Sequence, residues 1–265
     1  MAGTRGWQAA PAAGASRHSE PERAGPEQAP PLHCARRRIG AQCLSPGHRC
    51  HRVRSFIARL LVVVAAVLAG TAHGMTREQA LQALEHPDPG ARLAAIEQLA
   101  EVGRTADADR LLPRLTDAEP QIRSAASDAI WQLWSRSGDP AIDQLFERGV
   151  EQMAGGAYDR ALAAFNDIVA RKPEFAEGWN KRATVYFLMG QDEASLKDCD
   201  EVFKRNPNHW GALSGAGQIH LRLGHLQQAI DYFERALKVN PTLDNLRQAI
   251  PLIEQRLRDK QRRST

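Results

Sequence analysis

The chain has 265 residues, of which 43% are hydrophobic, so it is long enough for one or two domains with a sizeable core. Its formal net charge of +4 divides unevenly, because residues 1–75 hold ten Arg and three Glu, a charge of +7, which leaves −3 for residues 76–265. The basic excess belongs to the start of the chain, so we predict no nucleic-acid partner. Cys199 is the one cysteine after residue 75, which excludes an internal disulfide there.

The first 74 residues divide into two segments. Residues 1–52 are rich in Ala, Arg, Pro and Gly without apolar periodicity, so we predict a disordered basic leader. Residues 53–74 combine a basic stretch, an apolar run and a small-residue exit, which is typical of a secretory signal peptide. We interpret residues 1–52 as lying upstream of a translation start near Val53; the alternative is a genuine extended leader. The pattern predicts export, to the periplasm of a bacterium, or anchoring to the inner membrane by residues 56–72 if the signal is uncleaved.

Between Leu145 and Pro241 the sequence repeats itself every 34 residues. Five columns keep this register: Gly149, Ala183 and Gly217; Gly156, Gly190 and Gly224; Ala161, Ser195 and Ala229; Phe165, Cys199 and Phe233; Pro173, Pro207 and Pro241. A glycine in the turn lets the chain reverse, small residues let two helices approach closely, and the proline stops the second helix. Each unit is therefore predicted to be a helical hairpin that stacks on its neighbours.

These repeats resemble the tetratricopeptide family over residues 141–241. The matching residues are Trp179, Ala183, Tyr186, Gly190, Ser195 and Pro207 in the middle unit and Leu213, Gly217, Gly224, Ala229, Phe233, Ala236 and Pro241 in the third. In the first unit they are Leu145, Gly149, Gly156, Tyr158, Ala161, Phe165 and Pro173, with Gln152 in place of the usual aromatic. The resemblance implies three units, at residues 141–173, 174–207 and 208–241.

A shorter repeat of 31 residues lies upstream, where the stretch that starts at Leu84 recurs from Leu115. The residues that keep its register are Pro89 and Pro120, Arg92 and Arg123, Ala95 and Ala126, and Leu99 and Ile130. This pattern resembles short HEAT-like repeats, which we place at residues 76–138. Residues 242–260 are predicted to cap the array as a helix that kinks or breaks into two at Pro251. The predicted fold class is all-α, a right-handed solenoid of helical hairpins.

Residues that could carry chemistry are sparse after residue 75. The histidines His220 and His225 are five apart, a spacing that does not place them on one helix face, so we predict no zinc site. Cys199 is interpreted as a small buried core residue. No nucleophile with a neighbouring base stands out, and we predict no enzyme activity and no cofactor. Trp131 and Trp134 are predicted to join the two repeat blocks; the alternative is an exposed docking patch.

The resemblance implies a binding groove lined by the first helix of each hairpin. By register, the candidate groove residues are Phe146, Val150, Met153, Asn180, Thr184, Phe187, Ser214, Gln218 and Leu221. The alternative for the first three is packing against the preceding HEAT-like helix. Chaperone-type members of the family grip a C-terminal carboxylate with Lys, Asn and Arg on this face. Phe146 and Val150 stand where Lys and Asn would be needed, which argues against that ligand class.

The predicted function is a non-catalytic scaffold or adaptor in the bacterial cell envelope that binds another protein or a peptide in the groove. The membrane is expected to be a partner only through an uncleaved signal segment. Two alternatives remain open: the repeats could frame an enzyme or metal-dependent factor, or the chain could be a membrane-anchored scaffold.

Overall fold

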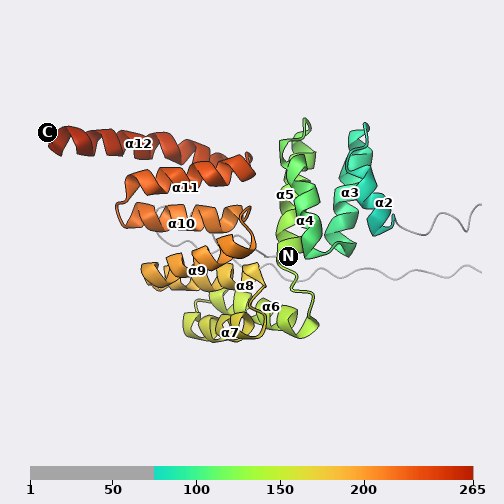
Figure 1. Cartoon of the computed structure of the whole chain (residues 1–265), viewed down its shortest axis with the longest axis horizontal. Helices are drawn as coiled ribbons and strands as arrows, with labels where there is room; N and C mark the ends of the chain where they lie inside the picture. The colour runs from blue at the N-terminus through green and yellow to red at the C-terminus, as the bar shows by residue number, and fades with distance from the viewer. Residues whose placement is uncertain (1–74, 265) are drawn as a thin grey trace, which may run out of the picture. The chain divides into compact units, whose positions relative to one another are not determined.

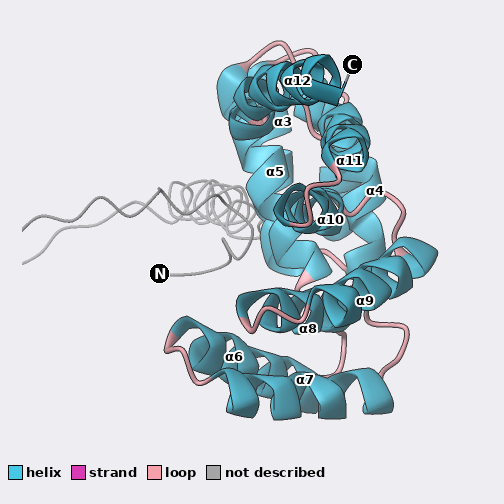
Figure 2. Ribbon diagram, turned by 90° about the vertical axis from the view of Figure 1, so that its left-hand side faces the viewer, coloured by secondary structure: helices cyan, strands magenta, loops and turns pink. Residues whose placement is uncertain are grey.

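The computed structural model describes residues 75–264, and within this range every regular element is a helix (Figures 1 and 2). The prediction of an all-α helical-repeat solenoid is confirmed. The predicted leader, signal peptide and membrane anchor lie outside the described residues. No helix in the described range is long and apolar enough to cross a membrane.

The upstream block, with the HEAT-like repeat, contains short helices and two longer ones. Its elements are α2 (Arg77–Ala83), α3 (Pro89–Val102), the 3₁₀ helix η2 (Thr105–Asp107), α4 (Ala108–Leu111), the 3₁₀ helix η3 (Leu112–Thr116) and α5 (Pro120–Trp134). Helix α2 starts with a capping box, in which the Thr76 hydroxyl accepts from the Gln79 N–H and the Gln79 side chain accepts from the Thr76 N–H. Pro89 and Pro120 stand in the first turns of α3 and α5, where a missing N–H costs nothing.

The arginines that keep the 31-residue register, Arg92 and Arg123, form equivalent hydrogen bonds in the two repeats. Arg92 donates to the carbonyls of His86 and Pro87, six and five residues before it. Arg123 donates likewise to the carbonyls that lie five and six residues before it. Arg92 also forms two 2.9 Å hydrogen bonds to the carboxylate of Asp117, which lowers the pKa of that carboxyl group. The repeated Arg therefore fixes the turn before each long helix.

The downstream block consists of three helical hairpins, coloured yellow-green to red-orange in Figure 1. Their helices are α6 (Pro140–Ala154) with α7 (Tyr158–Arg171), α8 (Ala176–Leu188) with α9 (Asp192–Arg205), and α10 (Trp210–Arg222) with α11 (Leu226–Val239). Each turn contains a glycine with positive φ, at Gly156 (74°), Gly190 (75°) and Gly224 (75°). A side chain is strained in this backbone conformation, which explains why the column is glycine in every unit.

Close helix approach within each hairpin depends on matched small and large residues. A Cβ added at Gly149 would lie 2.9 Å from the Phe165 ring, and one at Gly217 would lie 2.5 Å from the Phe233 ring. In the middle hairpin both members of this pair differ: Ala183 replaces the glycine and Cys199 replaces the phenylalanine. These two residues belong to one fully buried cluster. A methyl group is therefore tolerated where the facing side chain is small, and Cys199 is a buried core residue, as predicted.

The array ends in α12 (Asp244–Ser264), a single helix with Pro251 inside it. The prediction that Pro251 could split this segment into two helices is therefore wrong. Leu246 and Ile253 are buried, whereas Leu252 is 62% exposed, so one face of α12 covers the last hairpin. An internal proline is tolerated where packing of this kind holds the helix on both sides of it.

Candidate partner-binding face

The nine predicted groove residues lie on the first helices of the hairpins, three each on α6, α8 and α10. The structure separates them by accessibility. Buried are Phe146, Asn180, Thr184 and Ser214; half-buried are Val150, Met153, Phe187, Gln218 and Leu221. A partner that lies against the described surface would reach the second set and not the first.

The HEAT-like block covers one end of this face, because α5 packs against the first turn of α10. The Trp131 ring meets the Trp210 ring edge-on, with 5.6 Å between centroids, and Trp134 stacks on the His209 ring at 4.6 Å. A Cβ added at Gly211 would lie 2.4 Å from the Trp131 ring, so α10 carries its glycine where the tryptophan approaches. The prediction that the two tryptophans join the blocks is confirmed, and the alternative of an exposed docking patch is wrong.

A buried polar network lies behind this joint. The Glu177 carboxylate is fully buried; its Oε2 accepts from the Asn180 amide at 3.0 Å and from His209 Nε2 at 2.7 Å. Its Oε1 lies 3.0 Å from Lys181 Nζ, and that ammonium group is also buried, 5.6 Å from the centroid of the Trp131 ring. His209 Nδ1 accepts from the Ala212 N–H, so the ring carries its proton on Nε2 and donates it to Glu177 while remaining neutral.

Burial alone raises the pKa of Glu177, but the Lys181 ammonium and the His209 hydrogen bond outweigh it, so the pKa is lowered and the carboxylate stays charged. A charged group that is paired and shielded from solvent in this way holds helices together. Sequence reasoning missed the network. Glu177 and Lys181 are four apart on one helix, a spacing that usually marks a surface ion pair.

The other buried groove residues bond or pack within their own block. Thr184 Oγ1 donates to the Asn180 carbonyl at 2.9 Å, and Ser214 Oγ donates to the Trp210 carbonyl at 2.7 Å. Phe146 meets the Phe165 ring at 6.0 Å and the Phe175 ring at 5.5 Å.

Val150 and Met153 pack against the same core cluster as Phe146. The described members of that cluster all belong to the first two hairpins. The alternative that these three residues pack against the HEAT-like helix is therefore wrong.

The face of α6, α8 and α10 that carries the nine groove residues is called the inner face below. At the C-terminal ends of α8 and α10 this face remains accessible. The Arg222 guanidinium lies 3.8 Å from the centroid of the Phe187 ring, and Arg222 donates to the Phe187 carbonyl and to the Asp192 carboxylate. Leu188 and Leu223, which follow on the same helix ends, are 45% and 43% exposed. This end combines apolar side chains with an arginine that neighbouring groups hold in place.

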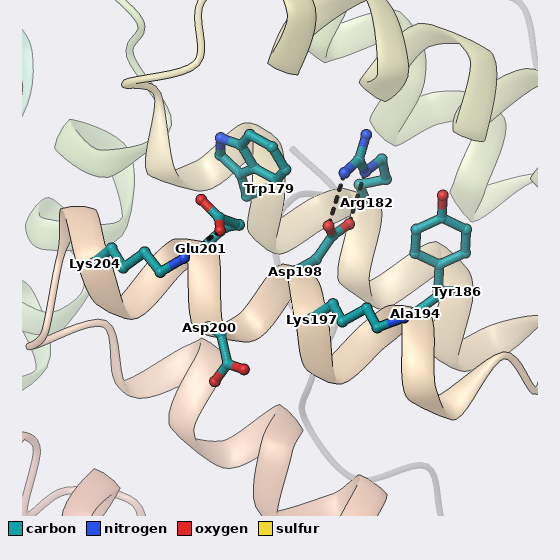
Figure 3. Close-up of a pocket in the computed structure, with 9 residues that line it drawn as sticks. All are labelled: Trp179, Arg182, Tyr186, Ala194, Lys197, Asp198, Asp200, Glu201 and Lys204. Atoms are coloured by element: carbon teal, nitrogen blue, oxygen red, sulfur yellow. Dashed lines mark hydrogen bonds and ion pairs between the residues drawn. The ribbon is translucent and has the colours of Figure 1, made fainter.

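A surface depression of about 520 Å³ lies on the second hairpin (Figure 3). Arg182 forms two 2.7 Å hydrogen bonds to Asp198, and the Trp179 ring lies 4.7 Å from the guanidinium groups of both Arg182 and Arg205. Burial raises the pKa of Asp198 despite its partner. Positive and negative side chains are balanced around this depression, so it offers a ligand no electrostatic potential of a single sign. Among the described residues, no group of three or more His, Cys, Asp or Glu side chains is arranged to hold a metal ion.

Comparison with known proteins matches the chain in three segments. Family models match HEAT repeats over residues 51–145 and tetratricopeptide repeats over residues 146–202 and 210–243. A TPR repeat-containing protein of Rhizobium etli is 29% identical over 150 residues, which are 56% of this chain and 74% of that protein. DnaJ homolog subfamily C member 3 of Homo sapiens is 30% identical over 108 residues, which are 41% of this chain and 21% of that protein.

A third relative, the Hsp70-Hsp90 organizing protein of Triticum aestivum, is 24% identical over 43% of this chain and 21% of that protein. The chain thus spans about a fifth of the length of these last two relatives. Among solved structures, the Sgt2 TPR domain from Aspergillus fumigatus has a TM-score of 0.44, with 19% identity over 47% of this chain and 83% of that chain. The first TPR of Spaghetti (RPAP3) bound to an HSP90 peptide has a TM-score of 0.42, with 24% identity over 44% and 92%. The family matches show that the chain carries HEAT repeats followed by tetratricopeptide repeats.

Proposed function

We propose that this protein is a non-catalytic scaffold or adaptor that binds a partner protein or peptide on the inner face of its tetratricopeptide block. The observation that carries the proposal is the accessible end of that face, where Met153, Phe187 and Leu221 are half-buried and belong to three successive hairpins. Apolar anchors on parallel helices, with an amide such as Gln218 between them, suit an extended or helical peptide segment.

The position of α5 limits what such a segment can be. Because Trp131 and Trp134 already cover the first turn of α10, the partner segment has to be short enough to lie on the C-terminal ends of α6, α8 and α10. Phe146 and Val150 offer no hydrogen-bond donor for a terminal carboxylate, so the partner is expected to insert apolar side chains instead.

The relatives are consistent with an interaction role, since the wheat relative is named as an organizer of Hsp70 and Hsp90. Identity to that protein covers about a fifth of its length, so its partners do not transfer to this chain. We place the function in the bacterial cell envelope on the signal-like pattern of residues 53–74 alone. Cell fractionation that finds the mature protein in the cytoplasm would rule out that location.

The proposal is tested by a crosslinked pull-down of the full chain beside a variant with Phe187→Asp and Leu221→Asp. Both charges would enter the accessible end of the inner face, so capture of the partner is expected to fall at least about tenfold, the equivalent of 1.4 kcal/mol. Circular dichroism checks that the helix content of the variant is unchanged.

The matched control is Leu252→Asp, which places the same charge on an exposed leucine of α12. The control is expected to capture the same partner as the unchanged chain. Equal capture by all three proteins would show that binding runs through another surface. Capture by none of them would remove the basis for the adaptor function.

A further inference from the structure

The turn of the third hairpin brings two histidines together. The Gly224 N–H donates to the Leu221 carbonyl at 3.1 Å, and the His225 N–H donates to the His220 carbonyl at 2.9 Å. These two bonds form a Schellman motif, in which the residue after the glycine folds back beside the residue five positions earlier. The rings of His220 and His225 therefore meet, with 3.4 Å between their Nδ1 atoms. Spacing on a single helix did not predict this, because His225 follows the end of α10.

The separation of the two nitrogens is informative. An N–H···N contact at 3.4 Å is longer than the about 2.7–3.2 Å of ordinary hydrogen bonds, so the two rings stabilise each other weakly. A tetrahedral zinc ion with Zn–N bonds of about 2.0–2.1 Å holds its ligand nitrogens about 3.3–3.4 Å apart. The two Nδ1 atoms thus already have the spacing of neighbouring zinc ligands.

We propose that His220 and His225 form an open metal site that binds one Zn²⁺ ion through their two Nδ1 atoms. No third His, Cys, Asp or Glu of the described residues completes the site, so water or a side chain of a partner protein fills the remaining positions. His225 is exposed, which leaves the ion accessible from solvent.

The surroundings favour the neutral imidazole that binds metal. Burial lowers the pKa of His220, the neighbouring His225 lowers it further, and the Asp200 carboxylate partly opposes both. The His220 ring also stacks on Tyr232, with 5.3 Å between centroids and 14° between the planes. This stacking fixes the ring orientation, so little rotamer freedom is lost on binding.

The other two hairpins supply matched replacements. The same turn bonds join Gln152 to Ala157 and Tyr186 to Gln191, so the contact is a property of the repeat and only the histidine pair is special to the third unit. His220→Gln introduces glutamine, the residue that the first hairpin has at the equivalent position, Gln152. His225→Gln likewise introduces the residue that the second hairpin has at the equivalent position, Gln191. His225 makes no side-chain cap to α11, so His225→Gln removes no capping bond.

The experiment is a calorimetric titration of the full chain with Zn²⁺, comparing it with His220→Gln, His225→Gln and the control His86→Gln. His86 is an exposed histidine on the HEAT-like block, outside the pair. Each change in the pair is expected to lower the stoichiometry by one zinc ion per chain, whereas the control keeps it. Counting the difference isolates this site from any zinc bound by histidines and cysteines elsewhere. Unchanged stoichiometry in both pair variants would overturn the proposal.

A second measurement uses the unchanged protein. Diethyl pyrocarbonate labelling, followed by peptide mass spectrometry, is expected to show that Zn²⁺ protects His220 and His225 together and leaves His86 reactive. Labelling of the pair that does not respond to saturating Zn²⁺ would also overturn the proposal, whatever the variants do.

Discussion

At the scale of single residues, the main feature is an ion pair, Glu177 with Lys181, that is buried between α8 and α10 instead of lying on the surface. Glu177 and Lys181 are buried, and their charges are compensated by each other, by Asn180 and by the neutral ring of His209. A buried ion pair contributes little to stability relative to apolar residues of the same size, but losing one member leaves a charge without compensation. The network therefore specifies how the two helices meet.

Glu177→Gln is expected to lower the free energy of unfolding by about 3–5 kcal/mol, because the Lys181 ammonium loses its counter-ion inside the core. Urea unfolding followed by circular dichroism measures the change. The control is Glu254→Gln, whose partner Arg258 lies 3.7 Å away between exposed side chains, and whose effect is expected to stay within about 0.5 kcal/mol. Equal unfolding midpoints for the two variants would contradict the assigned role.

The pH dependence of the same residue has a defined sign. The pKa of Glu177 is lowered in the folded state from its ordinary value of 4.5, so its stabilisation is fully present above pH 4.5 and is lost as the pH falls through the folded value. The glutamine variant is expected to lose this part of the acid sensitivity.

At the scale of the elements, each hairpin is held by a small residue on its first helix facing a larger one on its second. The outer hairpins use glycine with phenylalanine, and the middle one uses Ala183 with Cys199. The sequence showed these columns, but it did not show that they compensate for each other. Phe203, one turn further along α9, packs against the cluster of Cys199 and places an aromatic near the position that Phe165 and Phe233 occupy in the outer hairpins.

Cys199→Phe is expected to lower the free energy of unfolding by about 1–3 kcal/mol, because the new ring has no room beside the methyl group of Ala183. Adding Ala183→Gly recreates the pair of the outer hairpins and is expected to recover part of the loss. A double-mutant cycle by denaturant unfolding measures the coupling between the two sites. Strictly additive effects would show that the two positions do not contact each other.

At the scale of the whole described region, one core joins the HEAT-like block to the third hairpin and α12, while α6 and α7 enclose a separate cluster. Trp131, Trp134 and Trp210 form the contact between the blocks. The upstream block is thus tied to the far end of the tetratricopeptide array rather than to the hairpin that follows it in the chain (Figure 1).

Trp131→Ala is expected to lower the free energy of unfolding by about 3 kcal/mol. The places where the structure is destabilised give the sharper test. Amide hydrogen exchange should accelerate in both α5 and α10, while α6 and α7 keep the protection of the unchanged protein. Val102→Ala, at an exposed position of α3, is the control and should change neither. Acceleration confined to α5 would show that the two blocks are not stabilised by each other.

The features that could be predicted from the amino-acid sequence are those that depend on residues close together along the chain. The 34-residue period, the positive-φ glycines, the proline starts and the arginines of the 31-residue repeat all act through bonds over a few residues, so spacing alone revealed them. The joint formed by Trp131 and Trp134 was also predicted, from their place between the repeat blocks.

The accessible part of the inner face, in contrast, could be identified only from the folded structure. The register placed nine side chains there, but the way α5 docks depends on contacts between segments about eighty residues apart, such as Trp131 with Trp210 and Gly211. That docking covers the N-terminal end of the face and encloses the Glu177 network. In the same way, a turn bond rather than a helical spacing brought His220 to His225. Periodicity describes how each repeat folds, whereas the surface left for a partner depends on what packs against the repeats.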